Sequence, residues 1–316
     1  MRASAVQLTA FVALTAWQPA VAEPFPPTTG EFVRVEENNL LLGGMPDNPA
    51  SGIATKAQID AFFALLQAEK VEYRYVVGSC EDRAHFVAML ARKNNLPVSK
   101  IWAIAPARAS LLSRQLLHVK DPLGLTSEIS WGHHVAPVIL VATDAAEPTA
   151  MVIDQSISPE APIKLRDWMS ALGTPGATYL VTGTNDYLFN SLNGLTVYDN
   201  GSGSPSPMSF TLPAWLPNIL TGDFQKYSLQ SQSSVDSVIA EGMAMNDLAL
   251  AIYEVRLSVS SSDQAALKDV IKTEAAMTKL VSTGDVPSVS TAGRKSAQAF
   301  FAKRKTHWQE RLTALH

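Results

Sequence analysis

Three features are scarce in this 316-residue chain, and each narrows what the protein can be. Cys80 is its one cysteine, so the chain forms no internal disulfide, and a solitary cysteine is either a buried side chain or a reactive thiol. Charged residues make up 17% of the chain and the net charge is −4, which offers no basic surface for a polyanion, so we expect no nucleic-acid partner. No apolar run reaches the ~20 residues that cross a bilayer, so we expect no membrane span.

The first residues have the pattern of a secretory signal. Met1 and Arg2 give a positive start, residues 6–16 are mostly apolar, and Ala20-Val21-Ala22 forms an A-x-A cleavage site. We therefore expect cleavage after Ala22 and a bacterial protein secreted to the periplasm or the medium. A free thiol exported to an oxidising compartment is open to oxidation, so its retention hints that Cys80 has a function.

Hydrophobic spacing and turn residues divide the middle of the chain into short elements. We predict a helix over 55–67 with Thr55 as N-cap, and a second helix that begins at Ser79 as N-cap and runs to about Asn94. A third, short helix is expected over 165–172. Strands are predicted over 34–45, 71–77, 101–105, 131–142 and 150–153, with a turn at 144–148, irregular chain to His118, a loop over 121–130, and strand and loop over 179–192.

The composition changes after Asp199. Residues 200–207 (NGSGSPSP) are typical of a linker, and helical spacing dominates from about Ser233, over 235–257, 263–280 and 292–315. We therefore expect an α+β core with a C-terminal α-helical extension. The predicted divisions are a signal peptide over 1–22, an N-terminal segment over 23–69, a catalytic core over 70–199, a linker region over 200–232 and the helical extension over 233–316.

Cys80 is the first candidate for chemistry, because it lies in the first turn of a predicted helix. Unpaired N–H groups and the helix dipole there favour a thiolate and can stabilise an oxyanion. The opposing interpretation is a small core residue, since one apolar stripe of this helix contains Cys80, Ala84, Val87, Ala88 and Ala91. The acidic neighbours Glu81 and Asp82 count against a thiolate. Position alone leaves both interpretations open.

A cysteine nucleophile needs a base, and histidine is the usual one. His85 lies five residues after Cys80 and points to a different helix face, so a structural hydrogen bond is expected for it. His133 and His134 begin an apolar strand, WGHHVAPVIL, and neighbours in a strand point to opposite faces. Only one of the two can then face Cys80, and the residues themselves leave the choice open.

Asp154 is the candidate group to orient the base, because it ends the buried-looking run Met151–Asp154. If residues 134–142 and 150–154 form an antiparallel hairpin, His134 and Asp154 lie at the same rim of the sheet. A turn centred near Asp144 would place them opposite each other, and one nearer Ala146 would offset them by several residues. The other interpretation of Asp154 is an ordinary turn residue.

Signatures of metal or cofactor binding are weak. The chain has no H-E-x-x-H, no paired cysteines, no Asp-rich calcium loop and no Walker or Rossmann glycine pattern. Adjacent histidines in a strand diverge, so His133 and His134 make a poor chelating pair. We expect no metal and no cofactor.

Three segments resemble the motifs of the protein-glutaminase (protein-glutamine deamidase) family. GSCEDRAH at 78–85 resembles its C-x-x-R-A-H helix start, WGHHVA at 131–136 its strand W-x-x-H-V-A, and VIDQS at 152–156 its I-D-P-S, with Gln155 in place of proline. Trp168 and the run Tyr187-Leu188-Phe189 resemble later landmarks. The resemblance covers about residues 70–192. The base of the family directly precedes Val-Ala, and this position is His134 here.

The resemblance implies a papain- or transglutaminase-like fold in which the helix bearing Cys80 packs on an antiparallel sheet. It implies attack by Cys80 on the side-chain amide of a protein-bound glutamine, release of ammonia, and hydrolysis of the thioester by water that His134 activates while Asp154 holds the imidazole. The partners would be proteins or peptides with exposed glutamine, and no cofactor is implied. Because family members carry an inhibitory pro-region, residues 23–69 are a candidate for one.

Other functions fit the same residues. A cross-linking transglutaminase shares the thioester and resolves it with an amine, and a cysteine protease would use the same three side chains on a peptide bond. A non-enzymatic secreted interaction protein could retain the fold and bind a partner through its C-terminal helices. Ammonia release without amine incorporation or backbone cleavage separates the glutaminase from all three.

Overall fold

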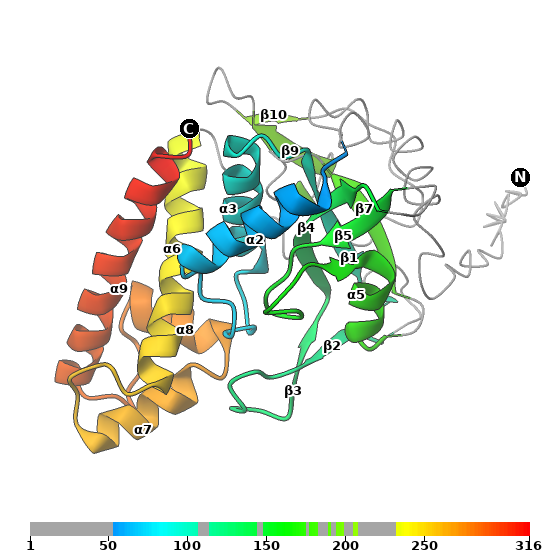
Figure 1. Ribbon diagram of the computed structural model, residues 1–316. Helices are drawn as coiled ribbons and strands as arrows, with labels where there is room; N and C mark the ends of the chain where they lie inside the picture. Colours follow the sequence, from blue (N-terminus) through cyan, green and yellow to red (C-terminus); the bar gives the residue numbers. More distant parts are fainter. Residues whose placement is uncertain are drawn as a thin grey trace, which may run out of the picture.

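The computed structural model describes residues 53–106, 114–143, 148–174, 177–182, 189–190, 194–198, 205–207 and 232–316. In this part of the chain, helices pack around an antiparallel sheet, and the C-terminal helices lie along one side (Figure 1). The predicted signal peptide, the strand over 34–45, almost all of the turn at 144–148 and the Tyr187-Leu188 landmark lie outside the described residues. The mixed α and antiparallel β architecture is confirmed.

The main sheet has five strands in the order β6-β5-β4-β1-β7, and every neighbouring pair is antiparallel. Its strands are β1 (Val98–Ile104), β4 (His133–Val141), β5 (Thr149–Val152), β6 (Ile163–Lys164) and β7 (Thr178–Thr182). Strand β1 begins three residues earlier than predicted. Ser99 and Lys100, near its start, are polar and interrupt the apolar pattern, although the strand is buried along its whole length.

Two smaller sheets flank the main one. Strands β2 (Leu117–Lys120) and β3 (Glu128–Trp131) form a hairpin where irregular chain and a loop were predicted. Strands β8 (Phe189–Asn190), β9 (Gly194–Tyr198) and β10 (Pro205–Pro207) form a three-stranded sheet, so β10 lies within the range predicted as a linker. The prediction of irregular chain and loop is wrong over β2 and β3, because short strands with polar positions give little hydrophobic alternation.

Alternate residues of β4 pack into two different cores. Val135 and Ile139 belong to the larger cluster, which includes α3 (Cys80–Lys93). Ala136 and Val138 point the other way, into a smaller cluster with α5 (Leu165–Ala171). Because neighbouring residues of a strand point to opposite faces, one face of the sheet packs against α3 and the other against α5. Helix α5 is confirmed close to its predicted range.

Helix α2 (Lys56–Ala68) begins where the sequence predicted, with Thr55 as N-cap. The Thr55 Oγ1 accepts from the Gln58 N–H at 3.2 Å, and the Gln58 Oε1 accepts from the Thr55 N–H at 2.8 Å, which completes a capping box. The apolar face of the helix lies in the larger core through Ile59, Phe62, Phe63 and Leu66. This packing places α2 against α3 and the sheet.

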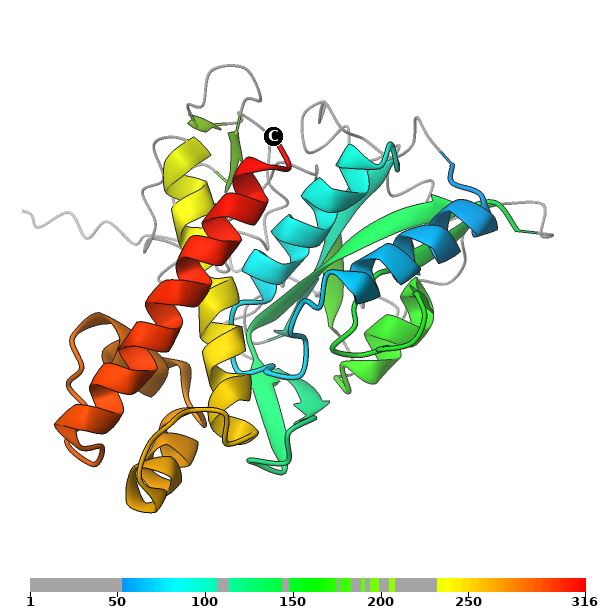
Figure 2. The same ribbon diagram turned by 60° about the vertical axis from the view of Figure 1, so that its left-hand side comes forward.

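Helix α3 is confirmed near its predicted range but is more enclosed than a single apolar stripe requires. The sheet covers one side and α6 (Gln232–Tyr253) the other (Figure 2), so Asp82, Arg83 and His85 are buried with the apolar residues. Two of these polar residues, Asp82 and Arg83, lie against α6. The Arg83 Nη1 donates to the Asn246 Oδ1 at 3.2 Å, and an added Cβ on Gly242 would lie 1.7 Å from the Asp82 Oδ2.

The segment 71–77, predicted as a strand, forms none. Side chains take up its carbonyl groups instead of a neighbouring strand. The Arg83 Nη1 donates to the Tyr75 carbonyl at 2.9 Å and the Trp131 Nε1 donates to the Val76 carbonyl at 2.8 Å. Val71, Tyr75 and Val76 are buried although no strand pairs with this segment, so the apolar pattern here reflects burial and not a sheet.

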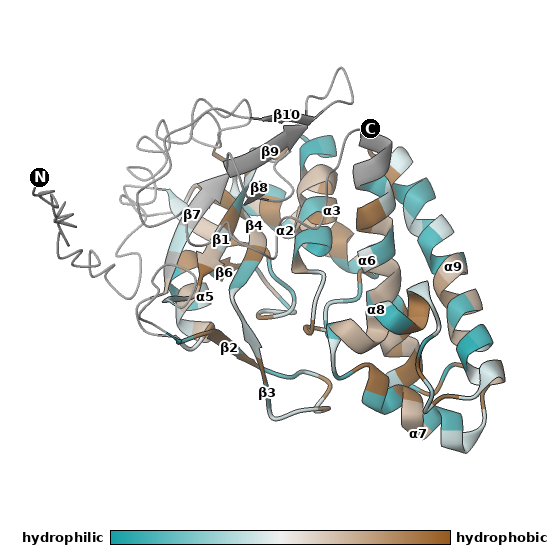
Figure 3. Ribbon diagram, turned by 180° about the vertical axis from the view of Figure 1, so that it is seen from behind, coloured by the Kyte–Doolittle hydropathy of each residue, from teal (hydrophilic) through white to brown (hydrophobic). Residues whose placement is uncertain are grey.

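The helices predicted after residue 233 are present as α6, α7 (Ser261–Val270), α8 (Glu274–Ser282) and α9 (Thr291–Thr313). The single helix predicted over 263–280 is wrong, because α7 ends at Val270 and Thr273 begins α8 as its N-cap, accepting from the Ala276 N–H at 3.3 Å. Helix α9 packs along α6 and is largely hydrophilic in colour, whereas α6 is more hydrophobic (Figure 3). Within the described residues, we find no helix with the length and apolar character that a bilayer crossing requires.

Candidate active site

A pocket opens beside the N-terminus of α3. The side chains around it come from α2, α3, β4 and the segment after β5, and they include Leu66, Cys80, His134 and Asp154. The three residues predicted as a catalytic set therefore line one pocket. The fold achieves this by placing the start of α3, the start of β4 and the end of β5 at the same rim of the sheet.

Cys80 is the first residue of α3, as predicted, and is buried. Ser79 precedes it with φ +60° and ψ +30°, in the left-handed region. Ser79 is the N-cap residue, as predicted, but a side chain that caps a helix N–H requires extended backbone, so Ser79 makes no such hydrogen bond. A non-glycine residue in this region stores strain, on the order of 1–3 kcal/mol, directly beside the thiol.

His134 and Asp154 form a buried pair. The His134 Nε2 lies 2.7 Å from the Asp154 Oδ2, and the two side chains are 1% and 7% exposed. The same Oδ2 accepts from the Trp168 Nε1 at 2.8 Å, while the Oδ1 accepts from the Ser156 N–H at 3.0 Å and its hydroxyl at 2.5 Å. Burial alone raises the pKa of Asp154, but the charge of His134 and these hydrogen bonds outweigh it and lower the pKa to about 2.

The register of the hairpin explains how this pair meets. Val138 pairs with Val152, and the Ile153 N–H donates to the Pro137 carbonyl at 2.9 Å. Continuing this register places Asp154 opposite Ala136, two residues from His134 on the same face of the sheet. The offset lies between the two registers that the sequence left open, and a diagonal pair at this separation is within reach of a histidine side chain.

Two indole rings hold the His134 imidazole. The Trp131 ring is stacked on it with centroids 4.4 Å apart and planes 8° apart, and the Trp168 ring lies at 5.8 Å. Nε2 is bonded to Asp154, whereas Nδ1 is buried and has no hydrogen-bond partner. The ring is thus fixed in orientation with one nitrogen left for exchange of a proton.

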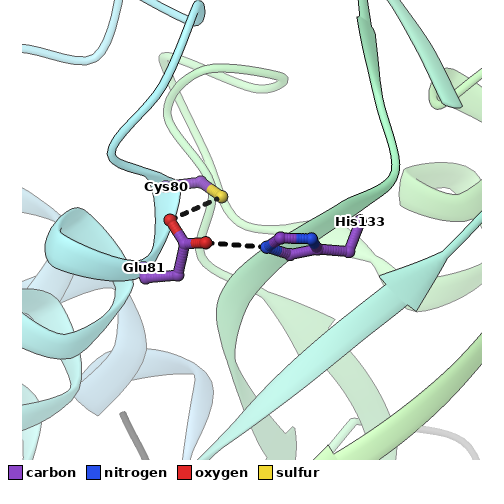
Figure 4. Close-up of side chains that lie close together, drawn as sticks. All are labelled: Cys80, Glu81 and His133. Carbon is purple, nitrogen blue, oxygen red and sulfur yellow. Dashed lines mark hydrogen bonds and ion pairs between the residues drawn. The ribbon is translucent and has the colours of Figure 1, made fainter. Parts of the chain in front are cut away.

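The Cys80 thiol donates to a different group, the Glu81 Oε2, at 3.3 Å. The other carboxylate oxygen of Glu81 lies 2.7 Å from the His133 Nε2, so the three side chains form a chain of contacts (Figure 4). Burial raises the pKa of Cys80, the charge of Glu81 raises it further, and Arg83 lowers it by less, so the pKa lies well above its usual range. Burial and the acidic neighbour therefore outweigh the helix start, and the thiol is protonated.

The position of His133 was missed by reasoning from the sequence. The His133 nitrogen and the Cys80 sulfur lie within 4.8 Å, while His134 lines the same pocket as Cys80. The two histidines point to opposite faces of β4, as strand alternation requires. Glu81, which joins His133 to the thiol, had no signal in the sequence beyond its place next to Cys80.

His85 is confirmed as a structural histidine. Its Nδ1 lies 2.5 Å from the Lys100 Nζ in the buried interior, and burial followed by the charge of Lys100 lowers the pKa of His85 well below its usual range. This contact joins α3 to β1. His85 is therefore committed to the packing of α3 on β1.

Comparison with known proteins supports the resemblance seen in the three motifs. Residues 58–172 match the Gln_deamidase_2 family, whose description is Glutaminase, and this match confirms the predicted similarity to protein glutaminases over that segment. A match of this kind favours a deamidating hydrolase. A comparison with curated proteins gives no match.

Similar solved structures are also protein glutaminases. A crystal structure of protein-glutaminase is 20% identical, with 47% of this chain and 81% of that chain covered and a TM-score of 0.38. The NMR structure of protein-glutaminase from Chryseobacterium proteolyticum is 19% identical, with 47% and 82% covered and a TM-score of 0.39. A crystal structure of pro-protein-glutaminase is 20% identical, with 48% of this chain and 55% of that chain covered and a TM-score of 0.38.

Proposed function

We propose that this protein deamidates glutamine side chains in proteins to glutamate, with Cys80 as nucleophile, His134 as base and Asp154 as the group that orients His134. One observation carries the proposal. The His134 Nε2 is bonded to a buried carboxylate while its Nδ1 is unpartnered, in a pocket that the Cys80 thiol also lines. A histidine that is oriented through one nitrogen and has the other without a partner supports the role of a base.

In the first half-reaction, the Cys80 thiol transfers its proton to the His134 Nδ1, and the sulfur attacks the side-chain amide carbon of the glutamine. The negative charge develops on the amide oxygen, where the backbone N–H of Cys80 at the start of α3 is the proposed donor. The imidazolium then returns the proton to the departing nitrogen, and ammonia leaves a thioester on Cys80. The Asp154 carboxylate stabilises the imidazolium while it exists.

In the second half-reaction, the neutral His134 takes a proton from water, and the resulting hydroxide attacks the thioester carbon. The carbon–sulfur bond breaks, the proton returns to sulfur, and glutamate is released. His134 thus serves twice as base and twice as acid while Asp154 stays ionised, consistent with the low pKa of that carboxylate.

The thiol must change its hydrogen-bond acceptor before it reacts. In the observed arrangement the Cys80 Sγ donates to Glu81, so a rotation about the Cys80 side chain has to move the sulfur toward the His134 Nδ1. Such hydrogen bonds commonly tighten only when the substrate is bound. We propose that an entering glutamine side chain favours this rotation by filling the pocket.

The deciding experiment incubates the purified protein with a glutamine-containing protein, and measures ammonia together with the conversion of glutamine to glutamate by mass spectrometry. We expect both in equal amounts, an intact peptide backbone, and no incorporation of an added primary amine. Cys80→Ser and His134→Ala should abolish the reaction while remaining folded by circular dichroism. Amine incorporation would assign a transglutaminase, and backbone cleavage would assign a protease. Absence of deamidation, amine incorporation and backbone cleavage would refute the proposal.

We further propose that the chain is exported after cleavage at Ala22 and that its core has a papain-like arrangement, in which a nucleophile-bearing helix packs on an antiparallel sheet. N-terminal sequencing of protein recovered from the medium or periplasm of an expressing bacterium tests the export. A first residue at Glu23 is expected. A mature chain that begins near residue 70 would instead indicate removal of a pro-region over 23–69.

A further inference from the structure

The contacts of Cys80, Glu81 and His133 define a second constellation, which shares Cys80 with the pocket. The ligand atoms of the three side chains, a sulfur, a carboxylate oxygen and an imidazole nitrogen, all lie within 4.8 Å of one another. Two of them come from the first turn of α3 and the third from the first residue of β4, and all three point toward one another (Figure 4). The side chains of Glu81 and His133 are 19% and 15% exposed, so an ion can reach them from solvent.

We propose that Cys80, Glu81 and His133 bind a borderline divalent cation, with Zn²⁺ as the ion that fits best. Thiolate and imidazole are ligands that Zn²⁺ prefers, and a carboxylate is a common third one. Tetrahedral bonds of about 2.0–2.3 Å place neighbouring ligand atoms roughly 3.3–3.8 Å apart. The Cys80 Sγ and the Glu81 Oε2 are 3.3 Å apart, the His133 Nε2 and the Glu81 Oε1 are 2.7 Å apart, and the ligand atoms all lie within 4.8 Å, so side-chain rotations have to bring them to these spacings.

The charges of the site balance when the ion is bound. The Cys80 thiol releases its proton to solvent and bonds to the metal as a thiolate, and Glu81 contributes a second negative charge, which together neutralise the dication. His133 binds as a neutral imidazole through Nε2 and carries its proton on Nδ1. Three protein ligands leave the fourth tetrahedral position for water.

This site gives the two adjacent histidines separate roles. His134 faces Asp154 and the indole rings on one side of β4, whereas His133 faces Glu81 and Cys80 on the other. Both sets require the same sulfur. A bound ion therefore removes the nucleophile from the proposed reaction, and this consequence for activity rests on the proposed function, whereas the binding itself does not.

The test of binding uses Co²⁺ as a coloured substitute for Zn²⁺ on the full chain after treatment with a chelator. We expect a thiolate-to-cobalt charge-transfer band, its displacement by Zn²⁺, and release of one proton for each ion bound. Cys80→Ser should remove the band. Glu81→Gln and His133→Ala should each weaken binding by at least about 100-fold, more than the 10–100-fold that groups outside the ligand set contribute.

His134→Ala is the matched control, because it removes the neighbouring imidazole from the same strand and should leave the cobalt band and affinity unchanged. Circular dichroism of each variant confirms that it is folded. Wild-type affinity in His133→Ala, or an equal loss in His134→Ala, would overturn the proposed ligand set. A Zn²⁺-dependent rise in melting temperature in the wild type, absent in His133→Ala, is the second measurement.

Activity assays separate this proposal from the proposed function. If ammonia is released, Zn²⁺ should inhibit the wild type and should inhibit His133→Ala much less, relative to the metal-free rate of each. If no ammonia is released but the cobalt band depends on all three residues, the metal site stands and the deamidation proposal fails. If ammonia is released and no band forms, the metal proposal fails alone.

Discussion

Replacing Asp154 by asparagine removes one charge from the buried pair and changes almost no volume. Both carboxylate oxygens accept hydrogen bonds, from His134 and Trp168 on one side and from the N–H and hydroxyl of Ser156 on the other. An amide has one accepting oxygen, so its NH₂ group must face donors in either orientation. The less costly orientation turns the NH₂ toward Ser156, whose hydroxyl can rotate to accept but whose N–H then loses its partner.

The expected magnitudes follow from these contacts. One buried donor without a partner and the loss of charge-assisted bonds should lower the free energy of unfolding by about 2–4 kcal/mol. The imidazolium that forms during the proposed reaction loses its carboxylate, and in a nucleophile–histidine–aspartate set this typically lowers kcat by about 10⁴-fold, or ~5.5 kcal/mol of barrier. The loss in kcat should therefore exceed what the loss in stability explains.

The assay measures ammonia release per folded molecule together with urea unfolding. Asp247→Asn is the matched control, since the Asp247 Oδ2 likewise accepts from an indole, the Trp308 Nε1 at 2.7 Å, but lies in the C-terminal helices. It should lose stability and retain kcat. The reasoning is refuted if Asp154→Asn keeps wild-type kcat, or if both variants lose kcat to the same extent.

Three further predictions concern acid stability, helix packing and thiol reactivity. The folded-state pKa of Asp154 is lowered to about 2, so its contribution to stability is complete above the unfolded value of about 4 and is lost as the pH falls toward 2. Over this window the urea midpoint of the wild type should fall by the equivalent of about 2–3 kcal/mol, and that of Asp154→Asn by less. Equal slopes in the two proteins would contradict this. Gly242→Ala should lower the melting temperature by the equivalent of about 1–3 kcal/mol, because the new Cβ would lie 1.7 Å from the Asp82 Oδ2 and must push α6 from α3. Gly78→Ala should cost far less, because its Cβ meets only the flexible Glu274 side chain at 3.2 Å. Similar losses in the two variants would show that the contact between Gly242 and Asp82 yields easily. Glu81→Gln should speed the alkylation of Cys80 by iodoacetamide, because it removes the charge that favours the protonated thiol. Intact-protein mass spectrometry measures the rate, and Glu254→Gln should leave it unchanged. A slower rate in Glu81→Gln would argue against this role.

Sequence reasoning succeeded where the signal is local. The helix at 56–68 follows from its capping residues and apolar spacing, and the hairpin of β4 and β5 follows from two apolar runs around a polar turn. It failed where tertiary contacts replace local pairing. The run 71–77 has the alternation of a strand, but Arg83 and Trp131 donate to two of its carbonyl groups, and Trp131 lies 55 positions from its partner Val76.

The candidate site divides in the same way. Cys80, His134 and Asp154 were chosen by motif order, and the register that brings the last two together depends on the turn, which periodicity alone does not determine. The contact of Glu81 with His133 joins residues 52 positions apart, and no spacing rule connects them. The raised pKa of the thiol comes from its burial and from Glu81, and the burial depends on tertiary packing that no spacing rule shows.

The enclosure of α3 has a consequence for the design of truncated fragments of this protein. The segment that matches the Glutaminase family ends at residue 172, yet Phe86 of that segment packs edge-on against Trp308 with centroids 5.1 Å apart, and Arg83 reaches Asn246. A fragment trimmed to the matched residues would turn this apolar and charged face to water, and we expect it to aggregate. The borders of sequence similarity and the borders of an independently folding unit are different here, so recombinant fragments should keep residues 53–316 together.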